Sequence, residues 1–316
     1  MADVVISEFM DEPTARGLIS AYDAHWDPGL WGKRADLLRA IADARAVVVR
    51  NATIVDPEFL DAAPHLKVVA RMGVGLDNID VEACKARGVE VCPSIGANAV
   101  SVAEYVIATA MILLRGPAYY ATADVAGGAW DRPKFAGGGE ISGRTMGVIG
   151  FGSIGQTVGH KARALGMEVI AYDAVMPDDA PAWQTTRRVD LPTLLVEADV
   201  ISLHCPKLPQ TIDLIDANAF AQMKPGAILI NSARGGIVNE AACAEALKTG
   251  QIAGAALDTL DVEPIDETAQ TIFKDMPNLI LSPHIAGVTQ ESNRRIAEVA
   301  AENVRRVLGA IEAIPA

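Results

Sequence analysis

The sequence predicts an α/β protein with two Rossmann-like domains, in which a doubly wound parallel dinucleotide-binding sheet is inserted into a smaller flavodoxin-like substrate domain. Three observations lead to this prediction. Short apolar runs alternate with amphipathic helical segments along the 316 residues, the pattern of parallel α/β sheets. The alternation falls into two blocks. A glycine-rich turn follows the first strand of the second block, as in dinucleotide-binding folds.

The first block contains strand-like runs separated by helical segments, which predicts a flavodoxin-like sheet of about 95 residues. The last helix of the chain, roughly Thr289–Gly309, is expected to pack back on this block. We therefore assign residues 1–97 and 289–316 to a substrate-binding domain. The runs are Asp3–Ile6, Ala46–Arg50, Lys67–Arg71 and Val89–Cys92, with helices near residues 14–22, 35–42, 57–62 and 81–87.

The second block, residues 98–288, opens with the most apolar region of the chain, from Ala97 to Leu114. This region contains Asn98 and Glu104 and is too short and polar to span a bilayer, so we expect a long buried helix. The glycines at 137–139 are expected to form a linker. Strand-like runs then predict a complete dinucleotide-binding sheet. They lie at residues 146–150, 168–172, 199–203, 227–231, 253–257 and 278–282.

Composition argues against several classes of partner. With 27 basic and 40 acidic side chains, the net charge of −13 opposes binding to nucleic acid or to an anionic membrane surface. The four cysteines are scattered without a C-x-x-C pair, which argues against a zinc site and a secreted disulfide framework. The N-terminus lacks a basic segment followed by a long apolar stretch. We expect a cytoplasmic protein with reduced thiols and no metal.

A G-x-G-x-x-G pattern, formed by Gly150, Gly152 and Gly155, stands between a strand-like run and a helix predicted over Ile154–Leu165. The first glycine makes a tight turn, the second admits a pyrophosphate, and the third lets helix and strand pack closely. The helix N-terminus would then hold the phosphates through free N–H groups. A tight turn without a ligand is the alternative, which the strand–turn–helix context disfavours.

Asp173 bears on which nicotinamide dinucleotide binds. It follows the run Glu168–Tyr172, where a carboxylate accepts both ribose hydroxyls of NAD and repels a 2′-phosphate. Arg187 and Arg188 could in principle hold the phosphate of NADP, but their position beside a short strand favours a solvated edge. The sequence therefore predicts NAD as the cofactor.

Arg234, Glu263 and His284 follow three successive strand-like runs of the second block, so parallel pairing would bring them to one crevice. Hydride transfer from a secondary alcohol needs a base for the hydroxyl proton, which an imidazole supplies. Glu263 would orient the ring and favour its protonated form, and Arg234 offers a bidentate fork to a carboxylate. Each residue alone is more often structural. Together, beside a nucleotide motif, they indicate chemistry on a small anionic substrate.

Several segments resemble the NAD-dependent D-isomer-specific 2-hydroxyacid dehydrogenase family, closest to its phosphoglycerate dehydrogenase-like branch. The resemblance implies an oxidoreductase acting between a small anionic 2-hydroxy acid and its 2-keto acid. Arg234 would bind the substrate, Glu263 would pair with the histidine, and His284 would be the acid/base. The matching segments are Arg71–Asp80, Ala97–Glu104, Gly150–Gly155, Leu203–Pro206, Met223–Gly226, Asn231–Gly235 and Ser282–Gly287.

The resemblance also implies cofactor and substrate contacts. The substrate carboxylate would receive backbone amides from the loop of Gly73, Val74 and Gly75, with Asn98 as a further substrate contact. Cofactor contacts beyond the glycines would come from Ser153, Ile154, Asp173, Cys205, Pro206, Ser232, Ala233, Asp258 and Gly287. The segment Asp258–Glu263 lacks the phenylalanine common in the family but keeps the step to the glutamate. The chain ends about 30 residues after His284, so the C-terminal regulatory domain of longer phosphoglycerate dehydrogenases is not expected.

The substrate itself stays open. Arg50 and Arg71 end two strands of the first block and would suit a second anion, although either could instead pair with Asp77 or Asp80. We hypothesise 3-phosphoglycerate or a sulfolactate-like acid, with glycerate or lactate-type acids as the alternative.

Two further expectations concern partners and other functions. The apolar helix from Val100 to Leu114, with Tyr119, Tyr120 and Trp130 after it, predicts a homodimer, unless it is simply domain core. An NAD(H)-sensing corepressor-like protein of the same fold is the main alternative function, and the complete trio argues against it. An NAD-dependent thioether-nucleoside hydrolase would need cysteine or lysine chemistry that the crevice lacks.

Overall fold

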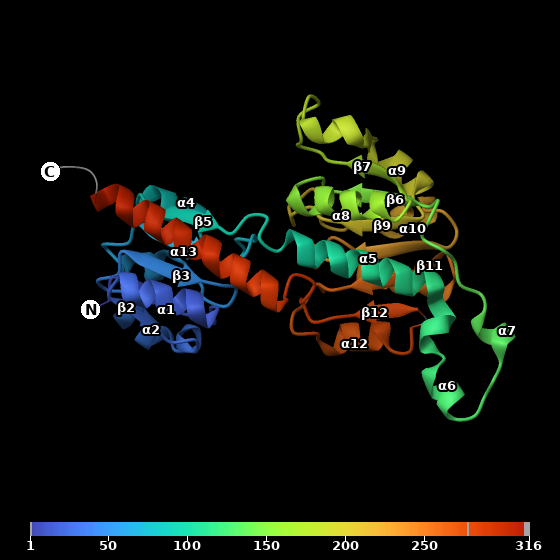
Figure 1. Cartoon of the computed structure of the whole chain (residues 1–316), viewed down its shortest axis with the longest axis horizontal. Helices are drawn as coiled ribbons and strands as arrows, with labels where there is room; N and C mark the ends of the chain where they lie inside the picture. Colours follow the sequence, from blue (N-terminus) through green and yellow to red (C-terminus); the bar gives the residue numbers. More distant parts are fainter. Residues whose placement is uncertain (1, 277, 313–316) are drawn as a thin grey trace. The chain divides into compact units, whose positions relative to one another are not determined.

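In the computed structural model, which describes residues 2–276 and 278–312, the chain forms two compact α/β units. Unit 1 runs to Asn98 and resumes at Val288, and unit 2 comprises Ala99–Gly287. Figure 1 shows the long final helix α13 (Gln290–Glu312) lying along the unit that contains the N-terminus. The described helices include none that is both long and apolar enough to cross a membrane.

Within its described residues, unit 1 holds a five-stranded parallel sheet in the order β2-β1-β3-β4-β5, which is the strand order of the flavodoxin-like fold class that the sequence predicted. β1 and β3 are buried on both faces, which explains their continuous apolar runs. β2 was not expected, because its three partly exposed residues at the sheet edge carry no apolar run. The strands are β1 Val4–Ile6, β2 Ala24–Trp26, β3 Ala46–Val49, β4 Val68–Arg71 and β5 Glu90–Pro93.

Helices cover both faces of this sheet and bury separate apolar layers. One layer includes α1 (Glu12–Ala21) and α13, and the other includes α2 (Arg34–Ala40), α3 (Pro57–Asp61) and α4 (Val81–Ala86). A short 3₁₀ turn, η1 (Leu30–Gly32), precedes α2. The side chains of Asp11, Asp56 and Asp80 accept backbone N–H groups at the starts of α1, α3 and α4, which fixes where these helices begin.

Unit 2, described except at residue 277, contains a seven-stranded parallel sheet in the order β12-β11-β10-β9-β6-β7-β8. The order reverses between β6 and β9, as in a dinucleotide-binding sheet, so the predicted fold class is confirmed. The strands are β6 Thr145–Ile149, β7 Glu168–Tyr172, β8 Arg187–Arg188, β9 Val200–Leu203, β10 Ala227–Asn231, β11 Ile252–Leu257 and β12 Leu279–Leu281.

Helices also cover both faces of this second sheet. α5 (Ala99–Arg115) and α8 (Ser153–Ala164) pack on one face, and α5 is the long buried helix that the sequence predicted. The other face is covered by α9 Leu191–Glu197, α10 Ala217–Gln222, α11 Glu240–Lys248 and α12 Glu267–Phe273. The 3₁₀ turn η3 spans Pro181–Thr185.

An arm that was not expected follows α5 and projects from unit 2 (Figure 1). It consists of η2 (Gly116–Tyr120), α6 (Thr122–Ala126) and α7 (Arg132–Phe135). The glycine stretch that follows is more than a linker, because the N–H of Gly139 donates to the carbonyl of Leu114 at 2.8 Å. A Cβ at Gly138 would lie 2.4 Å from the carbonyl oxygen of Arg115. The segment that leads back from the arm therefore needs glycine at this position to pass the end of α5.

Candidate active site

The carboxyl ends of β10, β11 and β12 lie level with one another in unit 2. Asn231 at the end of β10 pairs with Leu257 at the end of β11, which pairs with Leu281 at the end of β12. The loops that leave these strands carry Arg234, Glu263 and His284. Parallel register therefore gathers the three loops at one edge of the sheet.

His284 and Glu263 form a side-chain pair. Nδ1 of the imidazole lies 2.8 Å from Oε2 of the carboxylate, and both side chains are partly exposed, by 48% and 39%. The other carboxylate oxygen accepts the backbone N–H of Leu260 at 3.0 Å, which holds Glu263 against its own loop. Since Nδ1 faces the carboxylate, Nε2 is the ring nitrogen left for proton exchange with a substrate.

Asp258 holds the loop that carries His284. Its buried carboxylate accepts the backbone N–H groups of Ile285 at 2.9 Å and Ala286 at 2.8 Å, and the hydroxyl of Ser282 at 2.6 Å. Its carbonyl oxygen accepts the N–H of His284 at 2.8 Å. His284 has a φ of 56°, in the left-handed region that a non-glycine residue adopts only when its surroundings impose it.

The Arg234 loop packs closely on the loop that leads to Glu263. A Cβ at Gly235 would lie 1.7 Å from the carbonyl oxygen of Leu260, so this approach is possible only for glycine. Asn231 stabilises the turn, because its side chain accepts the N–H of Ala233 at 3.0 Å and donates to the carbonyl of Arg234 at 2.9 Å. The backbone contact thereby fixes the spacing of the arginine and carboxylate loops.

The glycine motif has the geometry that a dinucleotide requires. Gly150 has a φ of 87°, and a Cβ there would lie 2.6 Å from the backbone of His204 at the end of β9. A Cβ at Gly155 would lie 2.2 Å from the carbonyl oxygen of Gly150, whereas Gly152 is exposed and faces open space. α8 begins at Ser153 with Ile154 in its first turn. Its N-terminus therefore offers backbone amides beside an accessible glycine.

Other predicted cofactor contacts surround this turn. Ser232 and Ala233 follow β10, and the buried hydroxyl of Ser232 has no hydrogen-bond partner among the described residues, as expected of a group that meets a ligand. Cys205 is partly buried and Pro206 is exposed after β9. Burial raises the pKa of the Cys205 thiol to about 11. The donor set thus fits NAD at the switch point of the sheet.

Asp173 lies at the end of β7 and already accepts backbone hydrogen bonds. One oxygen accepts the N–H of Phe151 in the glycine turn at 2.7 Å, and the other accepts those of Val175 and Met176. These bonds place the carboxylate beside the nucleotide turn. Arg187 and Arg188 instead form exposed ion pairs with Glu197 and Asp178.

The predicted substrate residues of unit 1 lie at the ends of its central strands. Nη2 of Arg50 donates to Oδ1 of Asn293 at 3.1 Å. Burial lowers the pKa of the Arg50 guanidinium, and the Glu8 carboxylate opposes this shift. Asp80 caps α4 through the N–H of Ala83. Arg50 is therefore a partly buried cation whose guanidinium donates a hydrogen bond to the side-chain amide oxygen of Asn293.

Arg71 lies across the loop predicted to bind the carboxylate. Its Nη1 donates to the carbonyl of Met72 at 2.6 Å and occupies the place where a Cβ of Gly73 would be, 1.6 Å away. Gly73 has a φ of 136°, Val74 is exposed, and Gly75 is partly exposed. Oδ1 of Asn98 is buried without a hydrogen-bond partner among the described residues.

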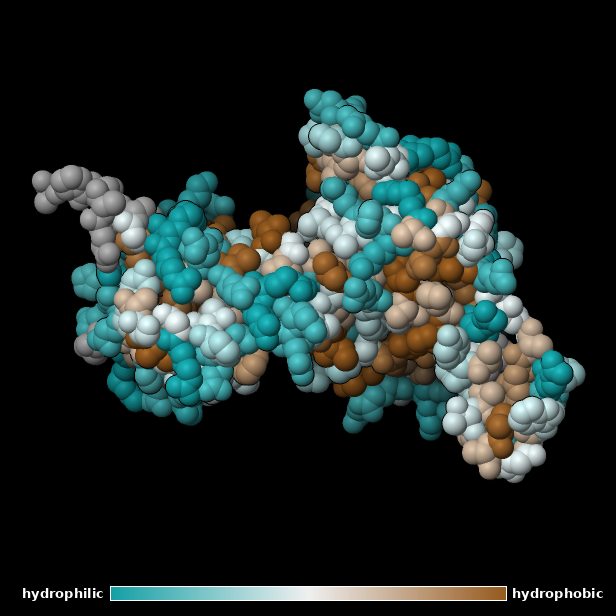
Figure 2. Space-filling view, in the orientation of Figure 1, coloured by the Kyte–Doolittle hydropathy of each residue, from teal (hydrophilic) through white to brown (hydrophobic). Residues whose placement is uncertain are grey.

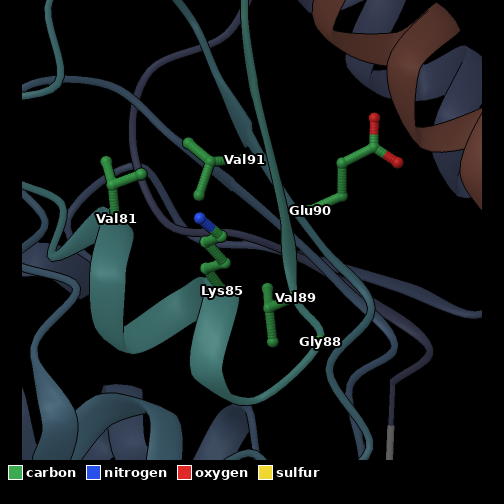
Figure 3. Close-up of a pocket in the computed structure, with 6 residues that line it drawn as sticks. All are labelled: Val81, Lys85, Gly88, Val89, Glu90 and Val91. Atoms are coloured by element: carbon green, nitrogen blue, oxygen red, sulfur yellow. The ribbon is translucent and has the colours of Figure 1, made fainter.

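The sequence did not single out Glu8, Tyr105, Ser282 or Gly235, although three of them follow strands and the strand-end rule could have found those three. A surface pocket between α4 and β5 carries no comparable chemistry (Figure 3). Lys85 points toward Val91 there, while Glu90 points away and pairs with Arg306 at 2.5 Å. In the described part of the chain, no cluster of His, Cys, Asp or Glu side chains could hold a metal ion.

Known proteins resemble this chain over nearly its whole length. (S)-Sulfolactate dehydrogenase from Chromohalobacter salexigens is 48% identical over 310 residues, which cover 98% of this chain and 99% of that protein. D-3-Phosphoglycerate dehydrogenase from Mycobacterium leprae is 42% identical over 96% of this chain, but the match spans 56% of its own length.

Solved structures and a family model agree with these relatives. A protein from Thermus thermophilus superposes with a TM-score of 0.85 and 33% identity over 97% of both chains. D-Lactate dehydrogenase from Aquifex aeolicus, solved with NAD and lactic acid, gives 0.81 and 27% identity over 98% of this chain and 97% of that one. Residues 107–286 match the family model for the NAD-binding domain of D-isomer specific 2-hydroxyacid dehydrogenases. The chain belongs to this family and is an NAD-dependent 2-hydroxyacid dehydrogenase.

Proposed function

We propose that His284 is the acid/base of this dehydrogenase, that Glu263 is its partner, and that Arg234 binds the substrate carboxylate. The observation that carries the proposal is the 2.8 Å contact between Nδ1 of His284 and Glu263, at the end of the sheet that holds the nucleotide turn. Bound NAD supplies the hydride acceptor, or as NADH the hydride donor. The remaining steps fall to side chains of this chain.

In the oxidation direction, Nε2 of His284 accepts the proton of the substrate hydroxyl as C2 loses its hydride. The carboxylate of Glu263 stabilises the imidazolium that forms and keeps the ring oriented. In the reduction direction the same imidazolium returns the proton to the carbonyl oxygen. Arg234 holds the carboxylate beside C2 through a bidentate contact, so the reacting carbon stays aligned.

Steady-state kinetics of the full chain test these roles. His284→Ala is expected to lower kcat by about 10²-fold to 10⁴-fold, the usual contribution of an acid/base. Glu263→Gln should lower it less, since the ring loses the carboxylate that orients it. Arg234→Ala should raise KM for the 2-keto acid. Full activity of His284→Ala would refute the assignment, and NADH binding without turnover on any 2-keto acid would favour a sensor.

We propose that the substrate carries a second anion, as in sulfolactate or 3-phosphoglycerate. Support comes from Arg50, a partly buried cation at the end of β3, and from the named activities of the sulfolactate and phosphoglycerate dehydrogenases above. Backbone amides of Gly73, Val74 and Gly75 would serve the carboxylate. Arg71 already donates to a backbone carbonyl, so Arg50 is the stronger candidate for the phosphate or sulfonate.

A panel of 2-keto acids separates the candidates. Sulfopyruvate and phosphohydroxypyruvate should be reduced with higher kcat/KM than hydroxypyruvate and pyruvate. Arg50→Ala should raise KM about tenfold or more for the dianions, the loss of one charge-assisted contact, and leave KM for hydroxypyruvate nearly unchanged. Equal losses on both substrate classes, or no loss on either, would exclude Arg50 as the second anchor.

We also propose a homodimer that uses α5 and the arm after it. The arm exposes Tyr119 by 56%, Tyr120 by 49% and Trp130 by 79%. Figure 2 shows hydrophobic residues over the neighbouring end of α5 as well. Such a patch favours burial against a second copy. Analytical ultracentrifugation should give a dimer that Trp130→Glu weakens, and a monomer at micromolar concentration would reject the proposal.

For location we propose the cytoplasm, because Cys84, Cys92, Cys205 and Cys243 are all free thiols. Cell fractionation tests this directly, and recovery in an oxidising compartment would contradict it.

A further inference from the structure

Tyr105 on α5 is hydrogen-bonded to the loop that carries His284. Its phenolic oxygen lies 2.7 Å from the hydroxyl of Ser282, and that hydroxyl lies 2.6 Å from Oδ1 of Asp258. Ser282 comes two residues before His284, directly after β12. A chain of hydrogen bonds thus runs from a helix on one face of the sheet to the carboxylate that holds the acid/base loop.

The carboxylate of Asp258 determines which atoms carry the protons in this series of hydrogen bonds. An ionised carboxylate accepts hydrogen bonds and donates none, so Ser282 must give its proton to Asp258. The oxygen of Ser282 can then only accept from Tyr105, whose hydroxyl must donate. Burial raises the pKa of Tyr105, and the charge of Asp258 raises it further, while the hydrogen bond to Ser282 lowers it by less. The pKa lies above its usual value, so the phenol keeps its proton. Each bond polarises the next in such a series.

The network fixes an unfavourable backbone conformation. The left-handed φ of His284 costs roughly 1 kcal/mol or more and needs surroundings that impose it. Asp258 imposes it by accepting the N–H groups of Ile285 and Ala286 on its side chain and that of His284 on its carbonyl oxygen. The left-handed turn then places Nδ1 of the imidazole 2.8 Å from Oε2 of Glu263. The orientation of the ring therefore depends on the orientation of the Asp258 carboxylate.

We propose that Tyr105 and Ser282 are positioning residues for His284, which act by orienting the carboxylate of Asp258 and thereby the left-handed turn of the acid/base. This inference rests on the proposed role of His284. Tyr105 touches neither His284 nor Glu263 through any described hydrogen bond, so its effect on turnover must pass through Ser282.

Kinetics of Tyr105→Phe, Ser282→Ala and the double variant test the inference. Tyr105→Phe keeps the ring and removes one donor, so kcat is expected to fall about threefold to tenfold, the value of one buried hydrogen bond. Ser282→Ala should lower kcat at least as much. The double variant should match Ser282→Ala, because residues in one series are not additive. Ser282→Thr keeps the hydroxyl and should restore most of the rate.

Two readouts separate positioning from a general structural defect. The loss in Tyr105→Phe should appear in kcat and leave KM for the 2-keto acid nearly unchanged, because the ring is misaligned while the proposed carboxylate contact of Arg234 is kept. The dissociation constant of NADH, from fluorescence titration, should rise by a smaller factor than kcat falls, even though Asp258 is itself a predicted cofactor contact. The matched control is Tyr22→Phe, which removes a phenol from unit 1 instead of unit 2 and should leave both readouts at wild-type values.

Several results would overturn the inference. Wild-type kcat in Tyr105→Phe, or multiplicative losses in the double variant, would show that Tyr105 does not act through Ser282. Weaker NADH binding with unchanged kcat would make both residues part of the cofactor pocket instead. Full turnover by His284→Ala would remove the proposed acid/base role itself, whereas its inactivity with a normal Tyr105→Phe would remove only the positioning role.

Discussion

Glu8→Gln is expected to loosen the loop that carries Arg50. Glu8 follows β1 beside β3, where the strand order of unit 1 reverses, and it is 4% exposed. Among the described residues, its Oε1 accepts the N–H groups of Arg50 at 2.7 Å and Thr53 at 3.0 Å. Its Oε2 accepts those of Ala52 at 3.0 Å and Asn51 at 3.3 Å. The carboxylate thus holds four successive backbone amides.

The magnitude follows from these contacts. Glutamine keeps a carbonyl oxygen for one pair of amides but turns an NH₂ group toward the other pair, so two hydrogen bonds to a charged acceptor are lost. Each is worth about 1.5–3 kcal/mol, which gives a loss of local stability of about 3 kcal/mol at the low end. Glu12→Gln is the control, because Glu12 is exposed and its pair with Arg16 one turn away is worth about 0.5 kcal/mol or less.

Hydrogen–deuterium exchange of the peptide that spans residues 50–53 measures this loss directly. A loss of about 3 kcal/mol corresponds to exchange roughly 10²-fold faster. The same variant should raise KM for a dianionic 2-keto acid and leave hydroxypyruvate nearly unaffected, since Arg50 loses its fixed position. Exchange and KM no different from those of Glu12→Gln would show that the amide bonds to Glu8 do not hold the loop.

Three other outcomes follow from the described contacts. Burial lowers the pKa of His204 from 6.5 to about 3, so its ring is neutral when folded and gains a proton on unfolding below pH 6.5. Stability should therefore fall between pH 6.5 and pH 3, by about 1–2 kcal/mol at pH 5, and a urea midpoint that falls equally in His204→Gln would refute the assignment. Burial raises the pKa of Cys84, Cys92 and Cys205 to about 11 and of Cys243 to about 12, so at pH 8 only about one in 10³ of the first three thiols, and about one in 10⁴ of the last, is ionised. Titration with a disulfide reagent should therefore find all four only after unfolding. Gly235→Ala should lower kcat strongly while the glycine turn still binds NADH, because the Cβ of the alanine would lie 1.7 Å from the carbonyl oxygen of Leu260. Unchanged turnover would mean that the close contact between the two loops is not needed for the reaction.

Sequence patterns predicted most of unit 2 because its central strands are buried on both faces. β6, β9 and β10 are continuous apolar runs, and the helix α8 directly follows the glycine turn. Local pattern was enough in these places. It failed for β2 and for the arm after α5, where short, exposed elements carry neither apolar runs nor strong helix periodicity.

The strand-end argument was applied to too few strands. It identified Arg234, Glu263 and His284 as candidates, because a cation, a carboxylate and an imidazole are groups that often take part in catalysis. Glu8 follows β1 by the same rule, yet a lone glutamate after a strand reads as a solvated loop. Its burial and its bonds to the amides of residues 50–53 depend on the pairing of β1 with β3, some 40 residues away in the chain.

Tyr105 lies beyond the strand-end argument altogether. It sits inside a helix that is mostly apolar and largely buried, so the sequence alone suggests one more position of the core. Its partner Ser282 is 177 residues away, and the direction of their hydrogen bond is set by a third residue, the ionised Asp258. A local pattern can indicate candidate reactive residues, because in a parallel sheet such residues stand at strand ends. It cannot predict the residues that orient them, since any polar group that packing brings within reach can take that role.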